Sequence, residues 1–399
     1  MDKIKNMKYP EYVGEIFARF SRFGEEAYIV GGSLRDALLG ITPNDFDIAT
    51  SAPPEKTIEL FSDKRVIETG LKHGTVTVIF DGEPVEITTF RVDGGYTDSR
   101  RPDSVSFTRS IEDDLSRRDF TVNAMAFNDE RGIVDVFGGR DDLKARVIRA
   151  VREPELRFSE DALRIMRAFR FSAQLGFSIE KNTLLGAQKT REGLSKIARE
   201  RICVEFIKLL TSPSPKEALE LMIEYGILPY VTGDYVSSKE SLRSLSLMQN
   251  DDFARLGLFF ADAEQERIRT VLHSLKCSNK QITGALAVAR GAKMCVDSPT
   301  SATSLIANTG DYAPFAARAS RLIGISAESA EELVSASRAP AKISDLKIGG
   351  RELIALGAKG KQIGTVLDAL LLEAMRDPDI NEKERLIDIA KGIINESRT

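Results

Sequence analysis

The stretch that decides the fold runs from Tyr28 to Ala49 and reads YIVGGSLRDALLGITPNDFDIA. Its first residues, Tyr28-Ile29-Val30, predict a strand. Gly31-Gly32 predicts a turn that brings backbone N–H groups close to a ligand, and a short helix is expected from Leu34 onward. The end of the stretch, Asp45-Phe46-Asp47-Ile48, alternates carboxylates with apolar side chains and predicts a second strand.

The two aspartates of this stretch are candidates for a metal site. On a strand, Asp45 and Asp47 would project from one face, with Phe46 and Ile48 buried behind them. Two neighbouring carboxylates repel each other unless a cation lies between them. Mg²⁺ takes oxygen ligands from one or two carboxylates and from substrate phosphates. The order strand, glycine turn, helix, Asp-x-Asp strand therefore predicts a site for a metal–triphosphate complex.

Composition narrows the class of protein. The 399 residues suffice for two to four folding units. With 56 basic and 60 acidic residues the net charge is −4, which argues against coating nucleic acid by bulk charge but leaves a local basic groove open. Three scattered cysteines and two histidines argue against zinc sites and disulfides. We expect a cytoplasmic protein with no signal peptide, membrane span or protein partner.

The segments around this stretch predict more of a mixed sheet. Apolar spacing predicts a helix over 8–23, and alternation predicts strands over 74–80 and 84–90, joined by a turn at Asp81-Gly82. Glu86 on the returning strand is either a third carboxylate facing the aspartates or a solvent-facing side chain. Residues 94–103 are rich in glycine and charge and predict a mobile loop.

The next motif is Arg117-Arg118-Asp119-Phe120-Thr121-Val122-Asn123-Ala124. Arg118 can neutralise phosphate oxygens, and Asp119 and Asn123 can form hydrogen bonds with ribose hydroxyls. The alternative is an exposed cluster of ion pairs.

Past residue 144, helical spacing replaces strand signals. Ser159 is expected to cap a helix over 161–171, on which Asp161, Arg164, Arg167 and Arg170 form a slowly drifting row. Asp161 accepts hydrogen bonds and Arg164 donates them, a combination that suits cytosine and adenine. Uracil and guanine would leave buried groups unpaired, at roughly 1–3 kcal/mol each. The alternative is an amphipathic helix with an i,i+3 ion pair.

The C-terminal half reads as helices without a catalytic constellation. Near its end, Lys359-Gly360-Lys361 opens a predicted helix, and lysines at a helix N-terminus suit an RNA phosphate. A packing unit of helices with glycine caps explains the same residues.

The motifs together resemble those of the polymerase β nucleotidyltransferase superfamily, in the version carried by class II tRNA nucleotidyltransferases and bacterial poly(A) polymerases. The resemblance implies an α+β fold, with a small mixed α/β nucleotidyltransferase head followed by an all-helical neck, body and tail. The implied boundaries are a catalytic head over 1–143, a nucleobase-selecting neck over 144–211, a body over 212–310 and a tRNA-binding tail over 311–399.

The resemblance also implies the reaction. The 3′-hydroxyl of tRNA would attack the α-phosphate of CTP or ATP, releasing pyrophosphate and building the terminal CCA without a nucleic-acid template. Two Mg²⁺ ions would be held at the catalytic carboxylates, Asp45 and Asp47, with Glu86 as a possible third. The nucleotide would be bound by Gly31, Gly32, Arg35, Arg118, Asp119, Asn123, Asp161, Arg164, Arg167 and Arg170.

The implied partners are CTP, ATP and a tRNA bound at its acceptor end and elbow, with Lys359 and Lys361 as tail contacts. The loop over 94–103 favours an enzyme that also adds the terminal A. The alternatives are a CC-adding or A-adding enzyme, a poly(A) polymerase, and an RNA-binding protein that has lost activity.

Overall fold

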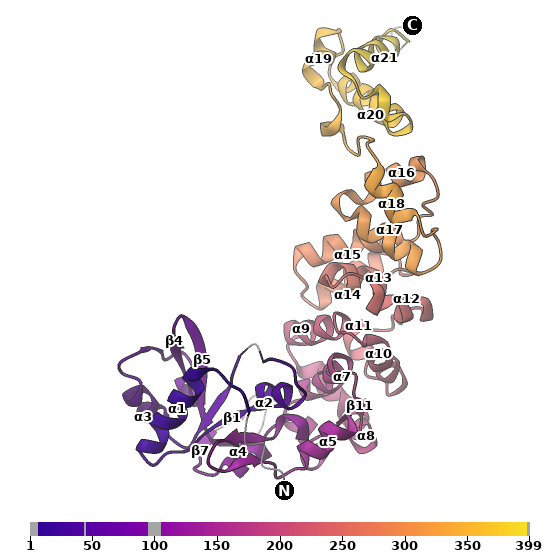
Figure 1. Cartoon of the computed structure of the whole chain (residues 1–399). Helices are drawn as coiled ribbons and strands as arrows, with labels where there is room; N and C mark the ends of the chain where they lie inside the picture. The colour runs from indigo at the N-terminus through magenta and orange to yellow at the C-terminus, as the bar shows by residue number, and fades with distance from the viewer. Residues whose placement is uncertain (1–6, 44, 95–104, 397–399) are drawn as a thin grey trace. The chain divides into compact units, whose positions relative to one another are not determined.

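A seven-stranded mixed sheet forms the centre of the N-terminal region (Figure 1). The computed structural model describes residues 7–43, 45–94 and 105–396. The strand order in the sheet is β3-β4-β5-β2-β1-β8-β9. The strands are β1 (Ala27–Val30), β2 (Ile48–Thr50), β3 (Arg65–Ile67), β4 (Thr75–Phe80), β5 (Glu83–Thr89), β8 (Ala126–Asn128) and β9 (Gly132–Val134).

Strand β1 lies inside the sheet, antiparallel to both β2 and β8. All four of its residues are buried, so both faces of the sheet are covered at this strand. Tyr28 and Val30 pack with Ile111 and Leu115 of α4 (Ile111–Ser116). Helix α1 (Glu11–Arg22) buries Val13, Ile16 and Phe20 completely, which confirms the helix predicted over 8–23.

The predicted hairpin is also confirmed. Strands β4 and β5 pair antiparallel with Phe80 opposite Glu83, and Asp81 and Gly82 both have positive φ between them. Strand β5 also runs parallel to β2, with Ile48 opposite Ile87. This places the Glu86 strand directly beside the strand that follows Asp47. The loop predicted over 94–103 lies, apart from Gly94, outside the described residues.

Two local predictions around the deciding stretch are wrong in detail. Helix α2 (Gly31–Leu38) begins at Gly31 itself, so the two glycines form its first turn instead of a separate turn. Strand β2 begins only at Ile48, and Asp45 to Asp47 lead into it. The alternation nevertheless persists, with Phe46 and Ile48 buried while Asp45 and Asp47 are exposed.

The remaining elements of this region include two small strand pairs and several helices. They are α3 (Pro54–Leu60), β6 (Arg91–Asp93), β7 (Val105–Phe107), α5 (Gly139–Ala145), β10 (Val147–Ile148), α6 (Pro154–Glu160), α7 (Leu163–Leu175), β11 (Ser178–Ile179), α8 (Lys181–Thr190), α9 (Arg199–Leu210), α10 (Pro215–Glu224) and α11 (Pro229–Thr232). The helix predicted over 161–171 is therefore displaced. Ser159 lies in the last turn of α6, and Asp161 lies between α6 and α7.

The chain divides into two compact units. One comprises Met1–Leu209 and Glu217–Val231, and the other Leu210–Lys216 and Thr232–Thr399. In the described residues, the second unit is helical: α12 (Lys239–Ser244), α13 (Asp252–Phe259), α14 (Gln265–Ser274), α15 (Asn279–Ala292), α16 (Pro299–Thr309), α17 (Ala313–Leu322), α18 (Ala330–Ala336), α19 (Gly350–Ala355), α20 (Lys361–Arg376) and α21 (Lys383–Glu396). The predicted fold class, a mixed α/β head followed by helices, is confirmed. The segment over 144–211 is not all-helical as predicted, because β10 and β11 pair within it.

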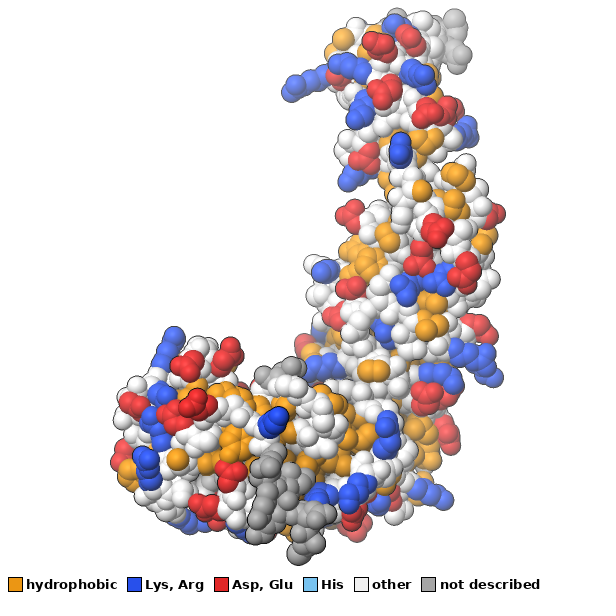
Figure 2. Space-filling view, viewed as in Figure 1, with side chains coloured by type: hydrophobic (Ala, Val, Ile, Leu, Met, Phe, Trp, Pro, Cys, Tyr) orange, Lys and Arg blue, Asp and Glu red, His pale blue; other side chains and the backbone are white. Residues whose placement is uncertain are grey.

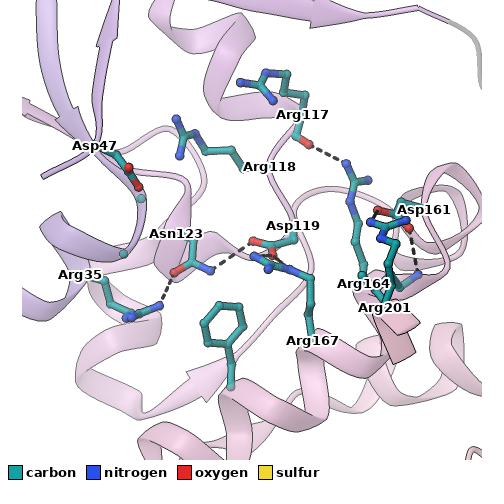
Figure 3. A pocket seen from close by; sticks show the side chains of 14 residues that line it. Arg35, Asp47, Arg117, Arg118, Asp119, Asn123, Asp161, Arg164, Arg167 and Arg201 are labelled. Atoms are coloured by element: carbon teal, nitrogen blue, oxygen red, sulfur yellow. Dashed lines mark hydrogen bonds and ion pairs between the residues drawn. The ribbon is translucent and has the colours of Figure 1, made fainter. Parts of the chain in front are cut away.

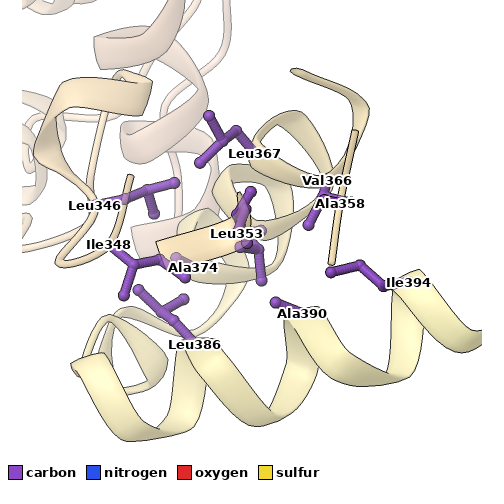
Figure 4. Packing of buried hydrophobic residues seen from close by; sticks show 11 residues of the cluster. Leu346, Ile348, Leu353, Ala358, Val366, Leu367, Ala374, Leu386, Ala390 and Ile394 are labelled. Carbon is purple, nitrogen blue, oxygen red and sulfur yellow. The ribbon is translucent and has the colours of Figure 1, made fainter. Parts of the chain in front are cut away.

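The last three helices enclose a hydrophobic cluster of their own (Figure 4). Leu353 of α19, Leu370 of α20 and Leu386 of α21 are fully buried in it. Outside such clusters, acidic and basic side chains are intermingled over the face seen in Figure 2, and their total numbers nearly balance, with a net charge of −4. Within the described residues, none of the helices has both the length and the apolar character needed to cross a membrane.

Candidate active site

Asp47 lies immediately before β2, the middle strand of the sheet. The N–H of Val30 donates to the carbonyl oxygen of Asp47 at 3.0 Å, which extends the pairing of β1 and β2 by one residue. This bond places the Asp47 side chain beside the first turn of α2. Partial enclosure by the protein and the charge of Asp45 raise the pKa of the Asp47 carboxyl. Arg118 opposes this effect, and Glu86 adds to it.

Gly31 allows the close approach of three elements. Its φ is +69°, a conformation that L side chains rarely adopt. A Cβ atom there would lie 3.2 Å from Nη1 of Arg118 and 3.7 Å from Oδ2 of Asp47. Glycine at this position therefore leaves an approach for a ligand between the aspartate and the arginine.

Two arginines are held at the site by one buried aspartate. Asp114 of α4 is 1% exposed, and it pairs with Arg117 at 2.8 Å and with Arg118 at 3.0 Å. Burial raises the pKa of the Asp114 carboxyl, but the charges of Arg118 and Arg117 lower it further, so the net shift is downward. Asp114 thus stays ionised and fixes both cations.

Asp119 is the centre of a hydrogen-bond network (Figure 3). Its carboxylate pairs with Arg167 at 2.6 Å and accepts from the Asn123 side-chain amide at 3.2 Å. The Asn123 carbonyl in turn accepts from Arg35 at 2.7 Å. Burial raises the pKa of Asp119, but Arg167 and Asn123 lower it more, to about 2. One chain of polar groups therefore runs from α7 to α2.

Asp161 and Arg164 lie close together but do not pair through their side chains. Asp161 accepts from the Leu163 N–H at 3.0 Å and pairs with Arg201 of α9 at 3.1 Å. Arg164 pairs with Glu160 at 2.6 Å and donates to the backbone carbonyl of Arg117 at 3.0 Å. The predicted acceptor and donor are present, each fixed by another partner.

These side chains line one cavity of 460 Å³ (Figure 3). Its lining contains six arginines and three aspartates, so it is strongly electropositive and suits a polyanion. The lining residues are Gly31, Gly32, Arg35, Asp47, Arg117, Arg118, Asp119, Asn123, Asp161, Leu163, Arg164, Arg167, Phe171 and Arg201. Ten of the residues predicted from the sequence are therefore brought together.

The other predicted residues lie outside this lining. Asp45 and Glu86 are both exposed and close enough to Asp47 to shift its pKa. Arg170 is buried against Glu205 at 2.6 Å. Lys359 and Lys361 are exposed at the start of α20, in the other compact unit.

Sequence reasoning missed several residues that hold the site together. Arg117, Leu163, Phe171 and Arg201 were not predicted as site residues, nor was Asp114, which anchors Arg118. The i,i+4 spacing of Asp114 and Arg118 is a signal that could have indicated their pairing. The contact between Asp161 and Arg201 spans 40 residues, and no local pattern predicts it.

The carboxylates fit a divalent cation that is shared with a substrate. Asp45 and Glu86 act on Asp47 as like charges, with Arg118 as the counter-charge. Among the described residues, no group of three or more aspartate, glutamate, histidine or cysteine side chains could hold a metal ion by itself. Such a site suits an ion that completes its coordination with substrate phosphates, as Mg²⁺ does.

Comparison with protein families defines the class. Residues 27–149 match the poly A polymerase head domain, and residues 176–233 match the probable RNA and SrmB-binding site of polymerase A. The first match spans the sheet and most of the cavity residues. The N-terminal region is thus a nucleotidyltransferase head, and the helices that follow it carry the second matched segment.

Similarity to individual proteins defines the family. The chain is 38% identical to a CCA-adding enzyme of Ligilactobacillus salivarius, with 96% of each chain covered. It is 49% identical over 227 residues to one from Leuconostoc mesenteroides. The crystal structure of the Bacillus stearothermophilus CCA-adding enzyme in complex with CTP has 32% identity, a TM-score of 0.80 and 97% coverage of each chain. The chain belongs to the family of CCA-adding enzymes.

Proposed function

We propose that this chain adds C, C and A to the 3′ end of tRNA from CTP and ATP without a nucleic-acid template. One observation carries the proposal. A single arginine-rich cavity joins Asp47, which we assign to metal binding, to Asp161 and Arg164, which we assign to the nucleobase. A nucleoside triphosphate has the matching order of groups, with its phosphates at one end and its base at the other.

The reaction requires the tRNA 3′-hydroxyl to attack the α-phosphorus, forming a new phosphodiester while pyrophosphate leaves. Gly31, Gly32, Arg35 and Arg118 would bind the triphosphate. Asp45 and Asp47 would hold Mg²⁺, which supplies activation of the hydroxyl and charge neutralisation of the leaving group when bound. Glu86, whose charge raises the pKa of Asp47, would add a third negative charge to this pair.

The ribose would lie against the Asp119 network. The Asn123 amide nitrogen has two N–H bonds and donates one to Asp119, so a second can meet a ribose hydroxyl. Arg167 holds Asp119 in place from α7. Arg170 lies one turn further along and would support the nucleotide through its neighbours.

Base selection would rest on groups that keep hydrogen-bonding capacity. Asp161 accepts one bond at each oxygen, and an ionised carboxylate has about four acceptor sites. Arg164 uses three of its five N–H bonds in recorded contacts among the described residues. The remaining acceptor and donor capacity fits the amine and ring nitrogen of cytosine or adenine, and it opposes the carbonyl of uracil or guanine.

The four-part division and the tail contacts are part of the proposal. The head over 1–143 would carry catalysis, the neck over 144–211 base selection, the body over 212–310 support, and the tail over 311–399 tRNA binding. The two lysines at the start of α20 would contact the tRNA backbone at the elbow. We place the reaction in the cytoplasm, where tRNA matures in bacteria.

The test is incubation of the protein with Mg²⁺ and a tRNA that ends before CCA. We expect CMP addition with CTP alone and complete CCA with CTP and ATP together. Arrest after two residues, or addition only to tRNA ending in CC, would identify a CC-adding or A-adding enzyme. A long A tract would identify a poly(A) polymerase, and no pyrophosphate release would refute enzymatic activity.

A further inference from the structure

One aromatic ring at the cavity wall is surrounded by three guanidinium groups. The ring of Phe171 lies 3.9 Å from the guanidinium carbon of Arg170 and 5.1 Å from those of Arg35 and Arg167. Phe171 is 5% exposed. These distances are within the range of cation–π attraction, which grows stronger as water is excluded.

Each of these guanidinium groups also has polar partners. Arg35 donates to Asn123 at 2.7 Å, and Arg167 pairs with Asp119 at 2.6 Å. Arg170 pairs with Glu205 at 2.6 Å. The polar partners bind the N–H groups, which lie in the plane of each guanidinium. The Phe171 ring is an additional contact that all three guanidinium groups share.

The ring also separates like charges. Burial lowers the pKa of the Arg170 guanidinium, Glu205 raises it, and the neighbouring charges of Arg167 and Arg35 lower it again. Each cation also has a carboxylate partner, which for Arg35 is Asp36 at 2.8 Å. The negative faces of an aromatic ring attract all three towards a common centre.

The position of the ring is itself fixed. Phe120, fully buried in the Arg-Arg-Asp-Phe motif, meets Phe171 edge to face, with 5.8 Å between ring centroids and 81° between planes. The ring is therefore a rigid reference between the head motif and α7. Its neighbours Arg35 and Arg167 both line the nucleotide cavity.

We propose that Phe171 is a positioning residue for nucleotide binding, and that the electron density of its ring faces sets where Arg35 and Arg167 stand in the cavity. The inference rests on the proposed function, because it assigns Arg35 to the triphosphate. It predicts an effect on CTP and ATP alike. Preference against UTP should not change, since Asp161 and Arg164 do not touch the ring in any recorded contact of the described residues.

The experiment replaces Phe171 with mono-, di- and trifluorinated phenylalanines in the full-length protein. Fluorine withdraws electron density, so each substitution makes the faces of the ring less negative while it changes the size of the ring little. We expect KM for CTP and for ATP to rise in step with fluorination, about fivefold for the trifluorinated ring. The kcat value, the melting temperature and the CTP-to-UTP ratio should stay near those of the unmodified protein. Calorimetric Kd for CTP should follow the same trend.

The matched control is the same series at Phe169. This residue lies on the same helix and is fully buried. Within the described part of the chain, its ring makes no cation–π contact. Its series should be flat. A Phe171→Leu variant keeps an apolar side chain without a ring and should raise KM at least as much as the trifluorinated ring.

A flat Phe171 series in KM and Kd, or a Phe171→Leu variant that loses only melting temperature, would overturn the inference. Failure of the proposed function is distinguishable, because the unmodified protein would then add no nucleotide to tRNA. In that case the calorimetric series still tests whether the ring governs CTP binding.

Discussion

At the scale of single residues, Asp47 and Asp161 lie in different surroundings and are expected to have different roles in the cavity. Asp47 sits next to the carboxylates Asp45 and Glu86, which raise its pKa, whereas Asp161 is bound by a backbone N–H and by Arg201. A change at the first should affect turnover for every nucleotide. A change at the second should affect which nucleotide is chosen.

The first prediction concerns catalysis. Asp47→Ala removes a carboxylate that we assign to Mg²⁺ and should lower CMP incorporation by more than about a hundredfold. The fold should survive, because the Asp47 side chain is exposed and its structural bond is made by the backbone. Incorporation assays and circular dichroism melting check this. Asp141→Ala, at an exposed side chain of α5, is the control, and equal losses in both variants would contradict the assignment.

The second prediction concerns base selection. Asp161→Ala removes the acceptor for the exocyclic amine and should reduce the preference for CTP over UTP by about 10- to 100-fold. Competition assays with both nucleotides measure the ratio. Glu155→Ala, on an exposed position of α6, should leave it unchanged. An unaltered ratio in the Asp161 variant would refute base reading by this residue.

At this scale the sequence predicts which residues lie at the site better than it predicts which partners their side chains contact. Alternating burial around Phe46 holds even though the strand begins later, because the apolar side chains still need the core. The i,i+3 ion pair of Asp161 and Arg164, which was the alternative to base reading, is wrong, because Asp161 pairs with Arg201 and Arg164 with Glu160. An arginine has several carboxylates in reach, and the tertiary arrangement decides among them, since Arg201 comes from α9 and Glu160 from α6.

At the scale of elements, helix boundaries were the least predictable feature. Ser159 and Asp161 are equally good caps by residue type. Pro154 at the first turn of α6 places Ser159 in the last turn of that helix, and the side chain of Asp161, just after it, accepts from the N–H of Leu163 at the start of α7. Two short helices separated by two residues give nearly the same apolar spacing as one, so periodicity alone did not distinguish them.

The third prediction concerns the start of α2. Gly31→Ala imposes a Cβ on a residue with φ of +69° and should cost about 1–2 kcal/mol of unfolding free energy. It should also raise KM for CTP, since the new methyl group would press on Arg118. At Gly364 in α20, an added Cβ atom would meet nothing within 4 Å apart from its own helix backbone. Gly364→Ala should therefore raise the free energy of unfolding by roughly 0.5–1 kcal/mol. Urea melts of both variants would contradict this reasoning if the two shifts had the same sign.

The fourth prediction concerns the link between α7 and the Asp119 motif. The lowered pKa of Asp119 stabilises the fold above its ordinary value near 4, and this stability is lost as the pH falls through about 2. Arg167→Met leaves the buried carboxylate unpaired, which should cost about 3 kcal/mol at neutral pH and raise its pKa. We therefore expect acid unfolding, followed by circular dichroism, at a higher pH in this variant.

The control for this prediction is Arg149→Met. That arginine also pairs with an aspartate, Asp142, but its side chain is 45% exposed. Removing it should leave the acid midpoint near that of the unmodified protein. An unchanged midpoint in the Arg167 variant would show that Asp119 is stabilised by other groups.

At the scale of the whole molecule, catalysis and tRNA binding are expected to separate. The cavity lies within the first compact unit, whereas Lys359 and Lys361 lie in the second, on helices with a hydrophobic cluster of their own. The sequence predicted the helical character of this region, but its clusters involve residues too far apart for any periodic pattern to show.

The fifth prediction tests that separation. A Lys359→Ala, Lys361→Ala double variant should raise KM for tRNA about three- to tenfold and leave KM for CTP unchanged. The dependence of log affinity on log salt should weaken by about two, because two RNA phosphates would no longer be neutralised by lysine. Lys391→Ala, an exposed lysine of α21 paired with Asp388, is the control. Equal effects in both variants would mean that only the general charge of this region matters.

One contact of the cavity has a consequence for evolution. Arg164 is tethered to residue 117 through a main-chain oxygen, at 3.0 Å. No change of codon at that position deletes a carbonyl, so genetic drift there leaves the tether in place. A change of the side chain at 117 therefore removes one cation from the cavity lining but keeps the backbone bond that positions Arg164.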